Sequence, residues 1–217
     1  MKITALLILL ALTTTAQAQY RNESGDAFSS TFDRYVTFSL SARYGVAMPL
    51  GGQKGYIDQL SPANLALEGE WLFPQRFSIG IKTGYQYNQQ RLGRQVADVG
   101  DQAVSAVQTR TLTVIPAMVS ASYYFAENSA AIRPYVQVAG GGAFVDYTNF
   151  YGTLADQNSG FKGAIAPAIG LKYYGQREKK FVAEIQAQYQ NVFFKYDLLR
   201  NSSPSLMLSA GIVYRWY

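Results

Sequence analysis

Apolar and polar residues alternate with a period of two over long stretches of this chain. Between residues 36 and 46 the even positions carry apolar side chains, among them Val36, Phe38 and Leu40, whereas the odd positions are polar or small. Such alternation is typical of a β-strand with one apolar and one polar face. The same pattern predicts further strands over residues 65–73, 77–87, 181–189 and 205–216.

Three other segments resemble strands but alternate less regularly, and they cover residues 109–125, 134–147 and 161–174. In the first, Leu112 and Val114 lie on one face, while the apolar residues that follow Pro116 lie on the other. Proline cannot donate to a β-ladder, so a bulge is expected at Pro116 and, for the same reason, at Pro167. Together these segments predict eight strands, with no helix after the first 18 residues.

The predicted connections alternate between two kinds. The short polar ones are residues 74–76, 126–132 and 175–179, and the longer ones are residues 48–63, 88–108, 148–160 and 191–204. Aromatic residues gather at both ends of the apolar faces, as in the interfacial girdles of an outer-membrane barrel. A soluble barrel or sandwich, the alternative, would show water many more charges than the 15% found here. The predicted fold is therefore all-β, an eight-stranded antiparallel transmembrane β-barrel with short periplasmic turns and longer extracellular loops.

The N-terminus has the pattern of a secretory signal peptide. Lys2 precedes a short apolar stretch, and Ala16-Gln17-Ala18 matches a cleavage site. The apolar stretch is shorter than the ~20 residues of a membrane-spanning helix. We expect a signal peptide over residues 1–18, a short polar extension over residues 19–33 and the barrel over residues 34–217, located in the outer membrane of a Gram-negative envelope.

Charged residues are rare on the polar strand faces, and both signs occur. An eight-stranded barrel has an interior just wide enough for side chains, and an unpaired charge there would be costly. The charges on these faces are therefore expected to pair across the lumen, which favours a plug of ion pairs over a wide aqueous channel. The predicted luminal charge network consists of Arg43, Glu68, Glu70, Lys82, Lys172, Glu184 and Arg215.

Candidate catalytic chemistry is sparse. The chain has no His and no Cys, so imidazole and thiolate mechanisms are excluded. Glu68 and Glu70 share a strand face at ~7 Å, within the range of a glycosidase pair, but a luminal ion-pair role is favoured over catalysis. The run from Gly140 to Gly142 has no following helix to form a phosphate loop. We predict no catalytic residue, no cofactor site and no metal site.

Two stretches resemble the OmpW-like and related small outer-membrane β-barrels. They are Ile115-Pro116-Ala117-Met118 with Tyr123-Tyr124-Phe125, and Ile132-Arg133-Pro134-Tyr135-Val136 with the glycines at 140–142. The resemblance implies a non-enzymatic barrel with a structural, envelope-integrity or surface-interaction role. It leaves open a narrow channel for small hydrophobic compounds, with a lateral opening near Pro116 and Pro167, or an accessory barrel of a secretion or gliding apparatus.

The expected partners follow from this location. Outer-membrane lipid and lipopolysaccharide would surround the barrel, and the barrel assembly machinery would read the C-terminal aromatic pattern of Tyr214 and Trp216, beyond which Tyr217 lies offset. The candidates for surface contacts are Arg91, Arg94, Asp98, Asp101, Tyr147, Phe150 and Tyr151, although a neutral role in coating the cell surface is favoured. No run of basic residues exceeds Lys179-Lys180, so nucleic acid is not an expected partner.

Overall fold

The computed structural model describes residues 35–74, 76–99, 102–126, 130–152, 154–175, 180–196, 199 and 202–216. The signal peptide expected over residues 1–18 and the extension expected over residues 19–33 lie outside the described residues. Within the described part of the chain, no helix has the length and apolar character needed to cross a bilayer.

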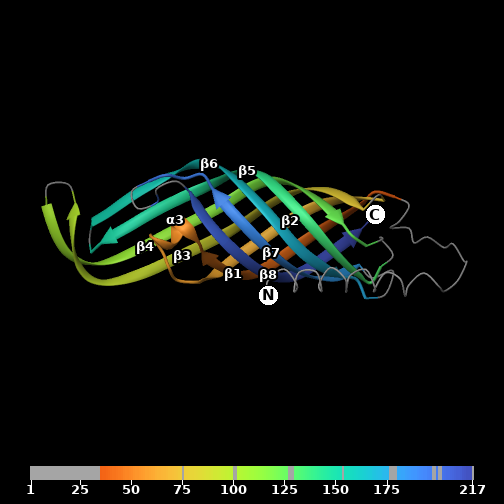
Figure 1. Cartoon of the computed structure of the whole chain (residues 1–217), viewed down its shortest axis with the longest axis horizontal. Coiled ribbons are helices and arrows are strands. Elements are labelled where there is room, and N and C mark those ends of the chain that lie inside the picture. Colours follow the sequence, from red (N-terminus) through yellow and green to blue (C-terminus); the bar gives the residue numbers. More distant parts are fainter. Residues whose placement is uncertain are drawn as a thin grey trace, which may run out of the picture.

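Eight antiparallel strands close into one barrel, in which each strand pairs with its neighbours in the sequence and β1 pairs with β8 (Figure 1). This confirms the predicted fold class. The strands are β1 (Thr37–Pro49), β2 (Ser61–Phe73), β3 (Phe77–Val99), β4 (Gln102–Tyr124), β5 (Ile132–Tyr151), β6 (Leu154–Tyr173), β7 (Phe181–Val192) and β8 (Ser203–Trp216).

The barrel is apolar outside and polar in the middle of its interior. Outward-facing Ile81 and Val119 are 59% and 61% exposed, whereas inward-facing Arg43 is 1% exposed. This arrangement is the reverse of a soluble core and suits a lipid surrounding. Phe38 packs against Trp71 and Trp216 near the strand ends that carry the short turns, with ring centroids 5.3 and 4.6 Å apart. We call this the short-turn end and the opposite one the long-loop end.

The strands differ in length, and this shapes the long-loop end. β1, β2, β7 and β8 have 12 to 14 residues, while β3 to β6 have 20 to 23. A tilted strand needs only ~9–11 residues to span a bilayer. The four long strands therefore continue as a sheet on one side of the mouth, which we call the tall wall, with the β3–β4 hairpin projecting furthest (Figure 1).

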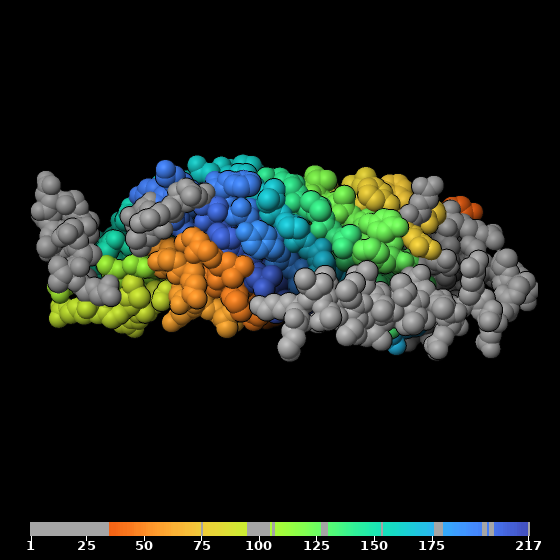
Figure 2. Space-filling model, viewed as in Figure 1, coloured from red at the N-terminus to blue at the C-terminus, as the bar shows by residue number. Residues whose placement is uncertain are grey.

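The tall wall corrects two sequence expectations about loops. The predicted long loops at residues 88–108 and 148–160 are mostly strand in the structure. Gly, Asn, Gln and Asp, which are frequent in loops, are common in these segments, yet such residues can also occupy a β-strand whose outer face meets water. A third long connection contains a helix where none was expected, α3 (Gly51–Lys54). Its segment packs against β8 on the surface of the barrel (Figure 2). The Leu50 N–H donates to the Pro204 carbonyl at 2.9 Å.

The expected bulges at Pro116 and Pro167 are absent, because the register is continuous through both prolines. Each proline leaves a short gap in residue pairing on one side only. The gap beside Pro116 lies between the β3–β4 pairs Thr83↔Ala117 and Gln86↔Val114. The apparent change of face within β4 has another cause, which is that Leu112 and Val114 point into the lumen. Register shifts occur instead between Gly45 and Ala47 and between Arg91 and Arg94.

Candidate functional site

The barrel lumen is the candidate functional site, and it has two layers of different chemistry. Toward the short-turn end lies the polar layer, and toward the long-loop end lies the apolar layer. The polar layer consists of Arg43, Glu68, Glu70, Lys82, Tyr124, Tyr135, Gln137, Lys172, Glu184 and Gln186. The apolar layer is built around Tyr56, Ile57, Leu112, Val114, Met118, Ala143, Val145, Tyr147, Ala164, Val192, Phe194 and Leu199.

Arg43 on β1 joins two carboxylates across the polar layer. Its Nη2 lies 2.7 Å from Glu68 Oε2, and its Nη1 lies 2.8 Å from Glu184 Oε2. Glu68 Oε1 also accepts hydrogen bonds from Ser120 Oγ and Gln137 Nε2, each at 2.7 Å. The guanidinium fork thus ties β1 to β2 and to β7, and the surrounding hydrogen bonds satisfy the carboxylate that burial would otherwise destabilise.

A second group of charges lies nearer the short-turn end. Lys172 forms an ion pair with Glu70 and donates to the Tyr124 hydroxyl at 2.7 Å. The Tyr124 hydroxyl in turn donates to Glu70 Oε1 at 2.6 Å. Lys172 Nζ also lies 4.0 Å from Glu184 Oε1, so Glu184 connects this group to Arg43. Five of the predicted network residues therefore form one linked set.

Lys82 lies apart from this linked set. Among the described residues it has no carboxylate within 4.0 Å, and its ammonium donates to the side-chain carbonyls of Gln137, Gln186 and Gln188. Gln137 links Lys82 to Glu68, because its side-chain amide group also donates a hydrogen bond to the Glu68 carboxylate. The polar layer holds equal numbers of buried cations and carboxylates, namely Arg43, Lys82 and Lys172 against Glu68, Glu70 and Glu184. Lys82 is connected to the others through glutamine side chains.

Arg215, the remaining predicted member, lies at the short-turn end instead. Its guanidinium carbon is 4.2 Å from the centroid of the Tyr174 ring, and Arg133 lies over the same ring at 4.7 Å. Arg133, which is buried, is a luminal charge outside the predicted network. The alternation that places Tyr135 and Gln137 inside would have found it, because residues 133, 135 and 137 share a strand face.

The apolar layer joins loop residues to the inner face of the tall wall. Tyr56 stacks on Tyr147 with ring centroids 4.3 Å apart, and Tyr147 packs edge-on against Tyr196 at 5.1 Å. The Tyr56 hydroxyl donates to the Thr148 carbonyl at 2.9 Å. Burial raises the pKa of the Tyr56 hydroxyl above its ordinary value, so the phenol stays neutral. Sequence reasoning missed this layer, because the aromatic residues come from connections far apart in the chain.

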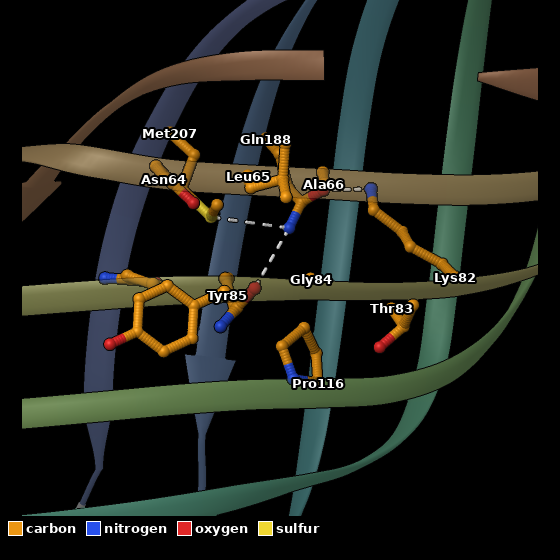
Figure 3. Close-up of a pocket in the computed structure, with 12 residues that line it drawn as sticks. Asn64, Leu65, Ala66, Lys82, Thr83, Gly84, Tyr85, Pro116, Gln188 and Met207 are labelled. Carbon is orange, nitrogen blue, oxygen red and sulfur yellow. Dashed lines mark hydrogen bonds between the residues drawn. The ribbon is translucent and has the colours of Figure 1, made fainter. Parts of the chain in front are cut away.

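A small cavity lies where the two layers meet (Figure 3). Its volume is about 10 Å³, which is roughly the room that one water molecule needs. Lys82, Gln188, Met207 and Pro116 are among the residues that line it. A space of this size does not hold an organic substrate.

The geometry of Glu68 and Glu70 does not favour a glycosidase pair. Glu68 is 3% exposed and paired with Arg43, and Glu70 is 4% exposed and paired with Lys172. Both carboxylates are thus engaged inside a packed lumen. Among the described residues, no group of three or more acidic side chains is arranged to hold a metal ion.

Comparisons with solved structures find the same architecture. Neisserial surface protein A matches with a TM-score of 0.53 at 14% identity, and the match covers 83% of this chain and 97% of that one. The chain has the fold of a small outer-membrane barrel. This confirms the small outer-membrane barrel fold that the resemblance implied. No family model and no characterised protein matches the chain by sequence.

Two further solved structures of outer-membrane proteins also match the chain. Outer membrane protein W of E. coli matches at 14% identity and a TM-score of 0.44, covering 83% of this chain and 98% of that one. The outer membrane protease OmpT of E. coli matches at 10% identity and a TM-score of 0.45, covering 83% and 96%. A barrel fold by itself does not specify an activity.

Proposed function

We propose that this protein is a non-enzymatic integral outer-membrane barrel with a closed lumen, acting in envelope structure or in surface interaction. The observation that supports this best is the contact of Arg43 with Glu68 and Glu184 across the barrel, at 2.7 and 2.8 Å. These side chains occupy the space through which a water column would pass. Above them the apolar layer packs in the outer half of the lumen, beside buried polar side chains such as Gln86 and Asn88.

The proposal extends to the route and surroundings of the protein. Residues 1–18 direct export, and the barrel assembly machinery inserts the chain into the outer membrane. Outer-membrane lipid and lipopolysaccharide then surround the apolar belt that includes Ile81, Val119 and Ile169, which are 59%, 61% and 62% exposed.

A non-enzymatic role is supported by the state of the luminal carboxylates. A general acid needs a substrate within hydrogen-bonding reach. Glu68, Glu70 and Glu184 are all engaged by cations or tyrosine hydroxyls instead. Their contacts suit a structural role, since each holds two or more strands together.

Planar-bilayer recording of the folded protein tests the closed lumen. We expect no conductance steps from the wild type. The variants Lys82→Ala and Glu184→Ala should also stay at zero conductance, because the apolar layer still closes the long-loop half. An unboiled gel sample from the same preparation verifies that a folded barrel was added. Stable unit conductance from the wild type would contradict the proposal.

A second candidate, a narrow passage for small hydrophobic compounds, is favoured by a different observation. The outer half of the lumen is lined by Leu112, Val114 and Val145, which are at most 2% exposed. The gap in β3–β4 pairing beside Pro116 lies next to it. The rate at which a hydrophobic fluorescent probe enters vesicles with and without the protein distinguishes the two candidate functions. Faster probe transfer at zero ionic conductance would favour the passage over the purely structural barrel.

A further inference from the structure

The β-bulge in β3 changes which face of the tall wall one arginine occupies. Arg91 pairs with Thr109 and Arg94 pairs with Val107, so Leu92 and Gly93 together oppose the single residue Gln108. In a regular strand, positions 91 and 94 would lie on opposite faces. The extra residue brings both arginines onto one face, and bulges often re-aim side chains in this way.

This shared face is the outward one. Asn88 and Gln86 of β3 point into the lumen and are at most 2% exposed, so Arg91 points outward. Arg94 shares its face with its partner Val107, which is 37% exposed. Both arginines are exposed. Phe150, which is 41% exposed, pairs with Thr109 on the same face. We name Arg91, Arg94, Val107, Thr109 and Phe150 the arginine patch.

The arginine patch continues the lipid-facing belt. Along β3 the outward residues run from Ile81 through Tyr85 and Tyr87 to Arg91. Tyrosines at the long-loop end of the belt are suited to the headgroup level of a bilayer. Arg91 comes four residues after Tyr87, which is about 13 Å along the strand and about 10 Å farther from the bilayer centre at the usual tilt.

We propose that the arginine patch binds the phosphate groups of a phosphorylated glycolipid in the outer leaflet. The proposal rests on the outer-membrane location argued above. Guanidinium groups bind phosphate oxygens through two parallel hydrogen bonds, and exposed apolar neighbours contact the lipid beside its headgroup. The bulge lets two arginines that are three positions apart in the sequence share one face, which a regular strand would not allow.

Another explanation of the same features is protection of an edge. Beyond the Ala63↔Tyr87 pair, the described part of β3 has no partner on the β2 side. Charged residues and bulges hinder edge-to-edge association of such strands. The two explanations predict different behaviour for a variant without the arginines, which is loss of lipid binding in one case and self-association in the other.

The test measures binding of rough lipopolysaccharide to the folded protein in detergent micelles. Arg91→Gln with Arg94→Gln should weaken binding at least about tenfold, since two charge-assisted contacts are removed. The matched control, Lys54→Gln with Lys162→Gln, removes two exposed cations from the same end and should leave the affinity unchanged. Dephosphorylated lipopolysaccharide should bind the wild type as weakly as the native form binds the double variant. Free inorganic phosphate should compete poorly.

An exchange of neighbouring residues, Gln90→Arg with Arg91→Gln, tests the geometry without changing the charge. It moves one guanidinium from the outward face to the inner face of β3 and should weaken binding, whereas binding that depends only on net charge would be unchanged. Heat-modifiable gel mobility verifies folding for each protein, so a failure of the barrel itself is distinguished from a failure of the patch. Three results would each overturn the proposal. The first is an equal loss of affinity in the control variant, and the second is equal affinity of the wild type for dephosphorylated and native lipopolysaccharide. The third is self-association of the double variant with its lipopolysaccharide affinity unchanged.

Discussion

At the residue scale, the polar layer shows how charges are accommodated inside this barrel. Arg43, Glu68 and Glu184 are each at most 3% exposed, and their contacts are short and mutual. Removing one partner of such a set leaves a buried charge without compensation, which costs more than the pair itself contributes. The stability of the barrel should therefore depend on individual luminal charges.

Arg43→Met should lower the free energy of unfolding by about 3–5 kcal/mol, because Glu68 and Glu184 would then face each other without their shared cation. Urea titration of tryptophan fluorescence in lipid vesicles measures this change. Lys162→Met is the matched control, because it removes an exposed cation and should shift the free energy by less than about 0.5 kcal/mol. Equal effects of the two variants would contradict the role given to Arg43.

Tyr56 should make the long-loop end sensitive to alkali. Burial raises its pKa in the folded protein above the ~10 of an unfolded tyrosine. The stability that its neutral form contributes is therefore complete below about pH 10 and is lost as the pH rises toward the folded-state pKa. Tyr56→Phe should remove this part of the loss of stability at alkaline pH. At neutral pH the substitution should lower the free energy of unfolding by about 1 kcal/mol, because the hydrogen bond to the Thr148 carbonyl is lost. Urea titrations at neutral and alkaline pH measure both effects, and an unchanged alkaline loss in the variant would refute the assignment.

At the element scale, close packing between neighbouring strands depends on where glycine occurs. A Cβ atom on Gly170 of β6 would collide with the ring of Tyr135 on β5, whose hydroxyl donates to Glu184 at 2.6 Å. A Cβ atom on Gly140 would meet no heavy atom within 4 Å. One glycine therefore makes room for a luminal tyrosine, whereas the other faces open space outside the barrel.

Gly170→Ala should destabilise the barrel by about 1–3 kcal/mol, since the added methyl group displaces the Tyr135 ring. Gly140→Ala should change the free energy of unfolding by less than about 0.5 kcal/mol. Urea unfolding of both variants in the same vesicles gives the comparison. A larger loss in Gly140→Ala than in Gly170→Ala would show that the ring does not pack over Gly170.

At the scale of the whole molecule, closure is the decisive property. The β1–β8 ladder runs from Phe38↔Trp216 to Pro49↔Ser205, so the first strand and the last are paired over nearly their full length. A closed barrel leaves no unpaired edge within the bilayer, which makes the folded form resistant to detergent.

Outer-membrane fractions run on SDS gels with and without boiling should show two mobilities for this protein. The unboiled band should differ in position from the boiled one, because a closed barrel keeps its shape in SDS until it is heated. Ser41→Pro, which removes an N–H from β1 where that strand pairs on both sides, is expected to abolish the unboiled band. A soluble periplasmic protein without a mobility shift would contradict the membrane assignment.

The sequence alone indicated the strand number, the inside-out polarity and most of the luminal charges. Alternation with period two is a local property, so the faces of Glu68, Glu184 and Arg43 could be assigned from their neighbours along the chain. The sequence does not indicate which of these charges contact each other. Arg43 and Glu184 lie far apart in the chain, and only closure of the barrel brings their strands together.

Only the tertiary structure decided the rest. Leu112 and Val114 appeared to be on the wrong face because the sequence gives no sign that the lumen turns apolar toward the long-loop end. That change depends on Tyr56 and Phe194, which reach the same space from distant connections. The tall wall and the bulge that aligns Arg91 with Arg94 likewise depend on pairing between strands. Local pattern fixes which side of a strand is apolar, whereas the contents of an enclosed space depend on all the strands that enclose it.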